Sequence, residues 1–163
     1  MDYLWTPWRY QYVTQGAGTQ GCVFCGIAAA DNDEKTLVVH RGEFNFVVLN
    51  RFPYTSGHTL VVPYAHLGTL EEMPDGALQE MMRLTRSLEA TLRRLYRAAG
   101  INLGMNIGEA AGAGVAAHIH MHVLPRWVAD SNFMTVISEA RVLPEDLATT
   151  WRRLREELQT VRE

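Results

Sequence analysis

The sequence predicts an α+β domain: a mostly antiparallel sheet of five strands, one long central helix and a helix at the C-terminus. Five short apolar segments separated by turn residues follow one another in hairpin order. Residues 74–99 instead carry leucines and methionines three and four apart, which is the periodicity of an amphipathic helix. A single long helix placed between runs of strands is typical of the α+β class.

Composition narrows the class of protein. The chain has 163 residues, of which 47% are hydrophobic and 20% charged, and this suits one domain over residues 1–163. The net charge of −3 predicts no nucleic-acid partner. We find no apolar run long enough for a membrane span and no signal-peptide pattern. The two cysteines indicate a reducing, cytoplasmic setting.

Residues 1–21 form an N-terminal arm that is unusually rich in aromatic side chains. Trp5, Trp8 and Tyr10 lie within the first ten residues, too many for a disordered tail. We expect the arm to pack over a hydrophobic groove; the alternative is that it covers a functional site or a subunit interface.

Cys22 and Cys25 form a CxxC pair at the end of this arm. They could be two buried small residues or a redox pair, but the following Gly26-Ile27-Ala28 does not resemble the helix start of a thioredoxin. A zinc half-site is the better interpretation, because this spacing lets two thiolates share one ion. Such a site needs two further ligands.

The regular elements are expected in the following order. After a polar turn at 31–35 come strands at 36–40, 44–49 and 58–63, the helix at 74–99, a strand at 101–107 and the strand that begins at residue 118. Pro74-Asp75 begins the long helix and Gly100 ends it. The remainder, 128–163, is a loop followed by an amphipathic helix at 144–162, with Leu147, Trp151, Leu154 and Leu158 on one face.

The last of these strands carries three histidines. His118, His120 and His122 alternate with apolar residues until Pro125 stops the run. Alternation in a strand puts the three imidazoles on one face, at intervals of about 7 Å. Three titratable rings in register are hard to explain as packing. Two interpretations remain open here: a metal site, or a histidine nucleophile flanked by helpers.

A loop of small residues leads into the histidines. Residues 106–117 begin with Asn106 and continue with glycines and alanines, which let backbone N–H groups converge on an anion. The loop could be a simple hairpin tip, but its position before three histidines favours a phosphate cradle. A histidine facing a bound phosphate can attack the phosphorus and form a phosphohistidine-type intermediate.

These motifs resemble the histidine-triad (HIT) family. His118-Ile119-His120-Met121-His122-Val123-Leu124 fits the family signature, and Gly57-His58-Thr59-Leu60-Val61-Val62-Pro63-Tyr64-Ala65-His66 is similar to an upstream family segment. The resemblance covers a core of residues 22–127. It implies a HIT-like fold and a nucleotide-binding hydrolase or transferase that cleaves at the α-phosphate. The tryptophan-rich start and Trp127 also resemble the diadenosine tetraphosphate phosphorylase branch.

The resemblance implies a role for each site residue. His120 is the nucleophile, with His118 and His122 completing the triad, and His122 contacts the phosphoryl or leaving group. The nucleotide contacts it implies are Asn50 on the ribose, Asn106 and the amides of Gly112, Ala113, Gly114 and Val115 on phosphate, and Trp127 on the base. Zinc-bearing relatives imply a structural zinc on Cys22, Cys25, His66 and His118. The family commonly has an acidic residue in place of Asn50 and a serine in place of Gly114.

The implied substrate is a dinucleoside polyphosphate such as diadenosine tetraphosphate. Water as acceptor makes the protein a hydrolase, and inorganic phosphate makes it a phosphorylase. One alternative is a nucleoside phosphoramidate or adenylate hydrolase, and another is a nucleotide-binding protein with little turnover. A third is a cupin-like metalloenzyme, but this sequence lacks the glutamate that such a fold needs a few positions after the histidine pair. We further expect a homodimer, because a small sheet leaves an exposed edge, with Trp127 reaching the adenine in the other subunit.

Overall fold

The structure is a computed structural model that describes residues 21–130 and 144–160. Within these ranges one antiparallel sheet has the strand order β1-β2-β3-β5-β4. The strands are β1 (Val38–Arg41), β2 (Asn45–Leu49), β3 (Thr59–Pro63), β4 (Gly100–Gly104) and β5 (Met121–Arg126). The helices are α2 (Val23–Ala29), α3 (Asp33–Thr36), α4 (Asp75–Tyr96), α6 (Leu147–Thr160) and the 3-10 helix η2 (Glu109–Ala111). The predicted α+β class is confirmed.

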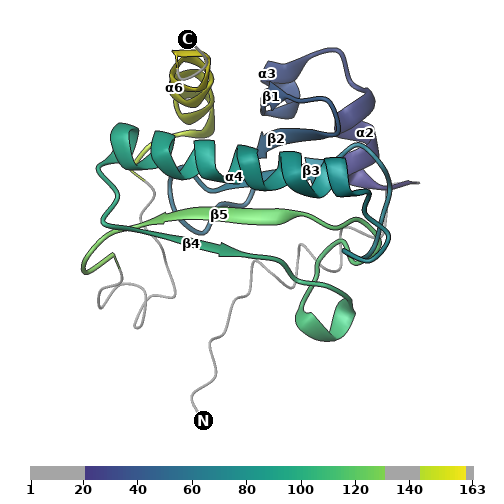
Figure 1. Cartoon of the computed structure of the whole chain (residues 1–163). Helices are drawn as coiled ribbons and strands as arrows, with labels where there is room; N and C mark the ends of the chain where they lie inside the picture. Colours follow the sequence, from purple (N-terminus) through teal and green to yellow (C-terminus); the bar gives the residue numbers. More distant parts are fainter. Residues whose placement is uncertain (1–20, 131–143, 161–163) are drawn as a thin grey trace.

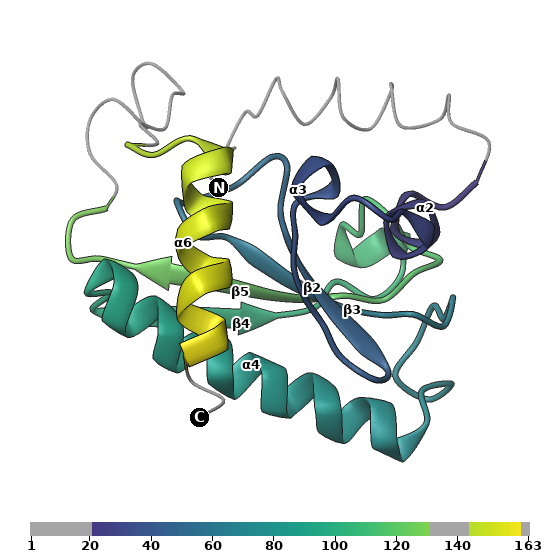
Figure 2. The same cartoon turned by 90° about the horizontal axis from the view of Figure 1, so that it is seen from above.

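The two long helices lie on one face of the sheet. Figure 1 shows α4 running along β5 and β3, and Figure 2 shows α6 crossing α4 near β1. Met81, Leu88 and Leu92 of α4 are almost fully buried against Val61 and Val123 of the sheet. Burying each such side chain contributes about 1.5–3 kcal/mol, so this layer supplies most of the core.

A smaller apolar cluster lies on the opposite face. Its centre is Phe24 of α2, which packs against inward-facing residues of the first three strands, namely Val38, Phe46, Val48, Leu60 and Val62. The alternation between the two clusters follows from the pleat, because Leu60 and Val61 point to opposite faces. This second face is the one that carries His122, since His122 lies opposite Leu60 in the β3–β5 pairing.

A buried carboxylate fixes α4 relative to the β1–β2 turn. Glu80 accepts hydrogen bonds from the backbone N–H groups of Glu43, Phe44 and Asn45, at 2.7–2.8 Å. The side-chain amide of Asn45 adds a fourth, at 2.9 Å. Gly42 is required beside it, because a Cβ there would lie 2.7 Å from a Glu80 oxygen. This contact sets the position of α4 relative to the first two strands of the sheet.

The histidine strand is shorter at its start than the sequence predicts. β5 begins at Met121, so His118 and His120 precede the strand and only the third histidine lies in it. The ladder with β3 runs only from Met121 to Val123. Before it, the N–H of Ile119 bonds to the carbonyl of Leu67 at 2.7 Å, which draws the chain away from the sheet.

The same strand is longer at its end than predicted. It continues through Pro125, which lies opposite Ile101 of β4, as far as Arg126. Proline is tolerated because the pairing with β3 has already ended at Val123, so the missing N–H faces no partner strand. The two short helices α2 and α3 were not expected; α3 replaces the polar turn and is capped by Asn32. None of the helices in the described ranges could span a membrane.

Candidate active site and metal site

Three histidine rings, those of the buried His58 and His120 and the half-buried His122, meet at the junction of β3 and β5. The ring centroids of His120 and His122 are 4.9 Å apart, and those of His58 and His122 are 5.1 Å apart. His58, at the entry to β3, lies in contact with His122. The fold thus gathers five histidines into two adjoining groups. His58, His120 and His122 form one group, and His118 with His66 forms the other.

The hydrogen bonding of His120 leaves one ring nitrogen available for attack. Its Nδ1 lies 2.9 Å from the carbonyl oxygen of His118. A carbonyl can only accept, so Nδ1 carries the proton and Nε2 carries the lone pair. Burial lowers the pKa of His120, and its side chain is only 7% exposed. The ring is therefore neutral at pH 7, as a nitrogen nucleophile must be.

A backbone amide determines where the proton sits on His122. The N–H of Tyr54 donates to Nδ1 of His58 at 3.2 Å, so His58 carries its own proton on Nε2. That Nε2 lies 2.9 Å from Nδ1 of His122 and donates to it. The remaining proton of His122 is then on Nε2. His122 is set as a donor, whereas His120 is set as an acceptor.

Burial and mutual proximity keep this pair of rings neutral. Burial, followed by the neighbouring His122 and His120, lowers the pKa of His58 to about 3. Burial, followed by His120, lowers the pKa of His122 to about 4. The ring of Tyr54 is tilted against that of His58, with centroids 4.8 Å apart, and is stacked with that of His122 at 6.3 Å. Tyr54 gave no signal in the sequence, because its contribution is a main-chain N–H and a tertiary contact.

Asn50 is engaged with the histidine network. Its side-chain nitrogen lies 3.3 Å from Nδ1 of His58, and its side-chain oxygen accepts the N–H of Phe52 at 3.0 Å. Asn50 is half-buried and follows β2 directly. The predicted ribose contact stays a prediction; the structure adds a second function for the residue, as support for His58.

The small-residue loop folds back on itself. Gly112 has a positive φ of 83°, and its N–H and that of Ala113 bond to carbonyls within the loop, at 2.9 and 3.4 Å. The N–H groups of Gly114 and Val115 have no acceptor within the part of the chain that the structure describes. The side chain of Val115 packs against the Phe24 cluster, which brings the loop to the histidine face. Two of the four predicted phosphate-binding amides are thus available to a ligand.

Trp127 lies away from the triad of its own chain, whereas Asn106 follows two residues after Gly104, which is paired with His122. The indole N–H of Trp127 donates to the carbonyl of Tyr96 at 3.0 Å, and the two rings meet edge to face. Trp127 is five residues beyond His122 along an extended strand, a separation of about 16 Å. Asn106 is half-buried in the segment between β4 and η2.

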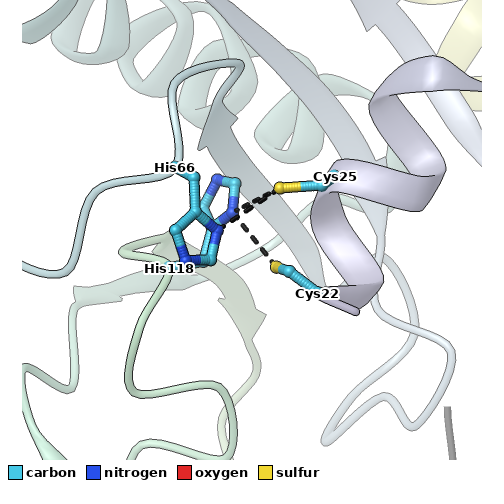
Figure 3. A group of neighbouring side chains, drawn as sticks. All are labelled: Cys22, Cys25, His66 and His118. Atoms are coloured by element: carbon cyan, nitrogen blue, oxygen red, sulfur yellow. Dashed lines mark hydrogen bonds between the residues drawn. The ribbon is translucent and has the colours of Figure 1, made fainter. Parts of the chain in front are cut away.

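Four predicted metal ligands converge from three separate segments (Figure 3). Cys22 precedes α2 and Cys25 lies within it, His66 follows β3, and His118 precedes β5. Their ligand atoms all lie within 4.8 Å of one another. We call these four residues the Cys/His cluster. His118 is fully buried and His66 is exposed, so the cluster lies at the rim of the domain.

The geometry of the Cys/His cluster fits a tetrahedral zinc ion. Sulfur and nitrogen ligands of one zinc lie about 3.6 Å apart. The Sγ of Cys22 is 3.3 Å from Nδ1 of His118, and the Sγ of Cys25 is 3.3 Å from Nδ1 of His66 and 3.7 Å from that of His118. The Nε2 of His118 donates to the carbonyl of Pro63 at 2.9 Å, which leaves its Nδ1 lone pair facing the sulfurs.

The raised pKa of the Cys25 thiol also favours a bound cation. Burial, and then the adjacent Cys22, raise the pKa of the Cys25 thiol, because two neighbouring thiolates repel each other. A divalent cation would compensate that charge and deprotonate both thiols. With four protein ligands the site would be closed, which is the arrangement of structural rather than catalytic zinc.

Comparison with known proteins identifies the class. The HIT domain model matches residues 32–128, and the chain belongs to the HIT family. An AP-4-A phosphorylase of Mycobacterium tuberculosis strain H37Rv is 37% identical over 162 residues, covering 94% of this chain and 83% of that protein. The resemblance inferred from the histidine motif is thereby confirmed.

Solved structures agree on the fold. A zinc-bound histidine triad family protein from Mycobacterium smegmatis superposes with a TM-score of 0.72 at 31% identity, covering 87% of this chain and 96% of that one. A histidine triad nucleotide-binding protein from Sulfolobus tokodaii gives 0.71 at 26% identity, covering 86% and 94%. The N-terminal arm, with Trp5, Trp8 and Tyr10, lies outside the described residues.

Proposed function

We propose that the protein cleaves dinucleoside polyphosphates, such as diadenosine tetraphosphate, at the α-phosphate through a nucleotidyl-histidine intermediate on His120. The observation that carries this proposal is the hydrogen bond from Nδ1 of His120 to the carbonyl of His118, which leaves Nε2 as a buried, neutral nucleophile. The similarity to an AP-4-A phosphorylase supports this substrate class and supports inorganic phosphate as the acceptor.

The proposed reaction has two displacements at one phosphorus. Nε2 of His120 attacks the α-phosphorus, a P–N bond forms, and the P–O bond to the leaving nucleotide breaks. The Nε2–H of His122 donates to a phosphoryl or leaving-group oxygen, and the amides of Gly114 and Val115 stabilise the negative oxygens. An oxygen of phosphate or water then attacks the same phosphorus. The P–N bond breaks and His120 is regenerated.

Zinc has no step in this scheme. Held by the Cys/His cluster, it would supply a tie between α2, the segment after β3 and the segment before β5. We propose that the protein acts in the cytoplasm, because its two cysteines form no disulfide and a reducing compartment would keep them available to a metal ion.

Product analysis tests the reaction and its acceptor. With diadenosine tetraphosphate and phosphate, a phosphorylase yields ADP and ATP, and labelled phosphate enters the β-position of the ADP. With water as acceptor the products are AMP and ATP, whether or not phosphate is present. A nucleoside phosphoramidate serves as the comparison substrate. Turnover of the phosphoramidate alone would replace the proposal by the phosphoramidate hydrolase alternative.

We also propose that the protein acts as a homodimer through β4. This strand is an edge of the described sheet, and its Leu103 is 47% exposed. Pairing with a second copy would cover that edge. The same arrangement offers Trp127, remote from its own triad, to the base in the partner's site.

A further inference from the structure

The ring of Phe24 contacts both the metal side and the reactive side of the histidine segment. Its centroid lies 5.4 Å from that of His118 and 4.8 Å from that of His120. Both distances are within the range for interacting aromatic rings. Phe24 is itself only 6% exposed, so the contact is a packed one.

His120 needs this contact to hold a fixed orientation. Among the described residues its ring makes one hydrogen bond, from Nδ1 to a carbonyl, which fixes one ring atom and leaves the ring free to pivot about that point. The rings of Phe24 and His122 lie 4.8 and 4.9 Å away and restrict the pivot. Displacing Phe24 would therefore let the His120 ring rotate, and the Nε2 that we propose as the nucleophile would lose its fixed orientation.

Phe24 lies in α2, a short helix that depends on tertiary contacts for its position. α2 has seven residues, no side-chain N-cap and only one buried residue, Phe24. Helices this short are not stable without tertiary contacts. Its C-terminal end is tied by the guanidinium of Arg41, which donates to the carbonyls of Ala28 and Ala30 at 2.9 and 2.8 Å. Its N-terminal end is tied through the two cysteines that flank Phe24.

We propose that Phe24 is a positioning residue for His120 and that metal in the Cys/His cluster keeps it in position. The inference rests on the proposed function of His120. Cys22 and Cys25 would hold the helix end by metal–sulfur bonds to the same ion as His118, the residue whose carbonyl orients His120. Loss of the metal frees the N-terminal end of α2 and leaves Phe24 held by apolar packing and by the Arg41 contacts at the C-terminal end. The occupancy of the metal site would then change the orientation of the nucleophile through the ring of Phe24.

The first experiment measures the His120 ring without any nucleotide. Diethyl pyrocarbonate modifies accessible imidazole nitrogens, and tandem mass spectrometry locates the modified histidine. We expect His120 to react at least fivefold faster after a chelator removes the zinc, with recovery when zinc is restored. The fully buried His58 is the internal reference: equal acceleration at both rings would mean general unfolding and would overturn the proposal.

Two variants separate the ring from the helix. Phe24→Leu keeps an apolar side chain and should show the fast His120 reaction with zinc still bound at the wild-type ratio. Ile27→Ala removes apolar surface from the same helix and the same cluster, and should react like the wild type. A wild-type rate in Phe24→Leu, or an equal increase in Ile27→Ala, would refute the positioning role.

The kinetic consequence is measured on the same proteins. With diadenosine tetraphosphate, Phe24→Leu should lower kcat about tenfold and change KM by less than about threefold, because orientation and not binding is lost. An unchanged kcat contradicts the proposal. Absence of turnover in the wild type would contradict the proposed function instead, and the modification experiment would still decide whether Phe24 positions His120.

Discussion

At the scale of single residues, the most direct prediction concerns His120. Replacing it with alanine removes the ring nitrogen that we propose as the nucleophile, so kcat should fall by at least about 1,000-fold. Nucleotide affinity should change little. Initial rates and equilibrium binding of a non-hydrolysable analogue measure the two quantities.

The matched control is His40→Ala, which removes a histidine of β1 that is outside the site. It should retain the wild-type kcat. Comparable loss in both variants would mean that His120 acts through stability, and thermal melting curves would then show the same shift in each.

The pH dependence of stability follows from the two histidine rings whose pKa values folding lowers most. His58 and His122 have pKa values of about 3 and about 4 in the folded chain, below the ordinary histidine value. Between about pH 6.5 and these values the unfolded chain binds more protons, so the free energy of unfolding falls as the pH falls. Each such histidine contributes about 1.4 kcal/mol per pH unit.

His58→Gln tests this assignment. The variant should lose less stability than the wild type between pH 7 and pH 5, measured by denaturant unfolding at saturating zinc. Comparing the two proteins cancels the pH dependence of the metal site, which both share. Parallel loss of stability would show that His58 is not kept neutral by folding.

The sequence predicted the chemistry-bearing side chains better than the groups that orient them. The Cys/His cluster could be assigned from spacing and resemblance, because metal ligands are recognisable by residue type. Tyr54 could not, since a backbone N–H has no residue signature. Phe24 was indistinguishable from ordinary core. The orientation of the site side chains depends on main-chain groups and tertiary contacts, and these produce no recognisable pattern in the sequence.

At the scale of elements, the Glu80 contact predicts a stability effect without a catalytic one. Glu80→Ala would leave three backbone N–H groups and the Asn45 amide without their acceptor, destabilising the protein by about 3 kcal/mol. Glu89→Ala, which breaks an exposed ion pair with Arg93 on the same helix, should change stability by less than about 0.5 kcal/mol. Denaturant unfolding measures both.

Catalysis should separate from stability in this pair. At a temperature where both variants are fully folded, kcat should be unchanged in each, because Glu80 lies at the end of α4 near the β1–β2 turn. A large fall in kcat for Glu80→Ala alone would mean that the position of α4 controls the site.

Element length decided which segments could be predicted. α4 has 22 residues, enough turns for its apolar stripe to be unambiguous. α2 has seven, too few to separate a helical period from chance. The start of β5 was misplaced because alternation continues through His118 and His120, although pairing with β3 begins only at Met121. Side-chain patterns record which face a residue takes, not whether a partner strand is present.

At the scale of the whole molecule, we predict a dimer with twice the chain mass of 18.4 kDa. Leu103→Glu places a charge at the exposed β4 edge and should give monomers by light scattering at micromolar concentration. Met82→Glu is the control, since Met82 on α4 is 54% exposed and Leu103 47%. Dissociation by Met82→Glu, with Leu103→Glu still dimeric, would move the interface to α4.

Subunit mixing tests whether Trp127 acts in the partner's site. If it does, a dimer of one His120→Ala chain and one Trp127→Ala chain has one site with both defects and one with neither. Activity of the mixture should then exceed that of either parent. No recovery after confirmed exchange would exclude a contribution across the dimer.

The strand order has a consequence for how the chain is made. β5 occupies the middle of the sheet, between β3 and β4, although it is the last strand in the described sequence. A ribosome therefore completes β3 and must go on from Pro63 to Met121 before the central gap can be filled, a delay of several seconds at about 5–20 residues per second. During that delay the nascent chain exposes two unpaired strand edges. The strand that carries His122 is thus also the one that completes the sheet, and chaperone demand should be highest just before β5 leaves the exit tunnel.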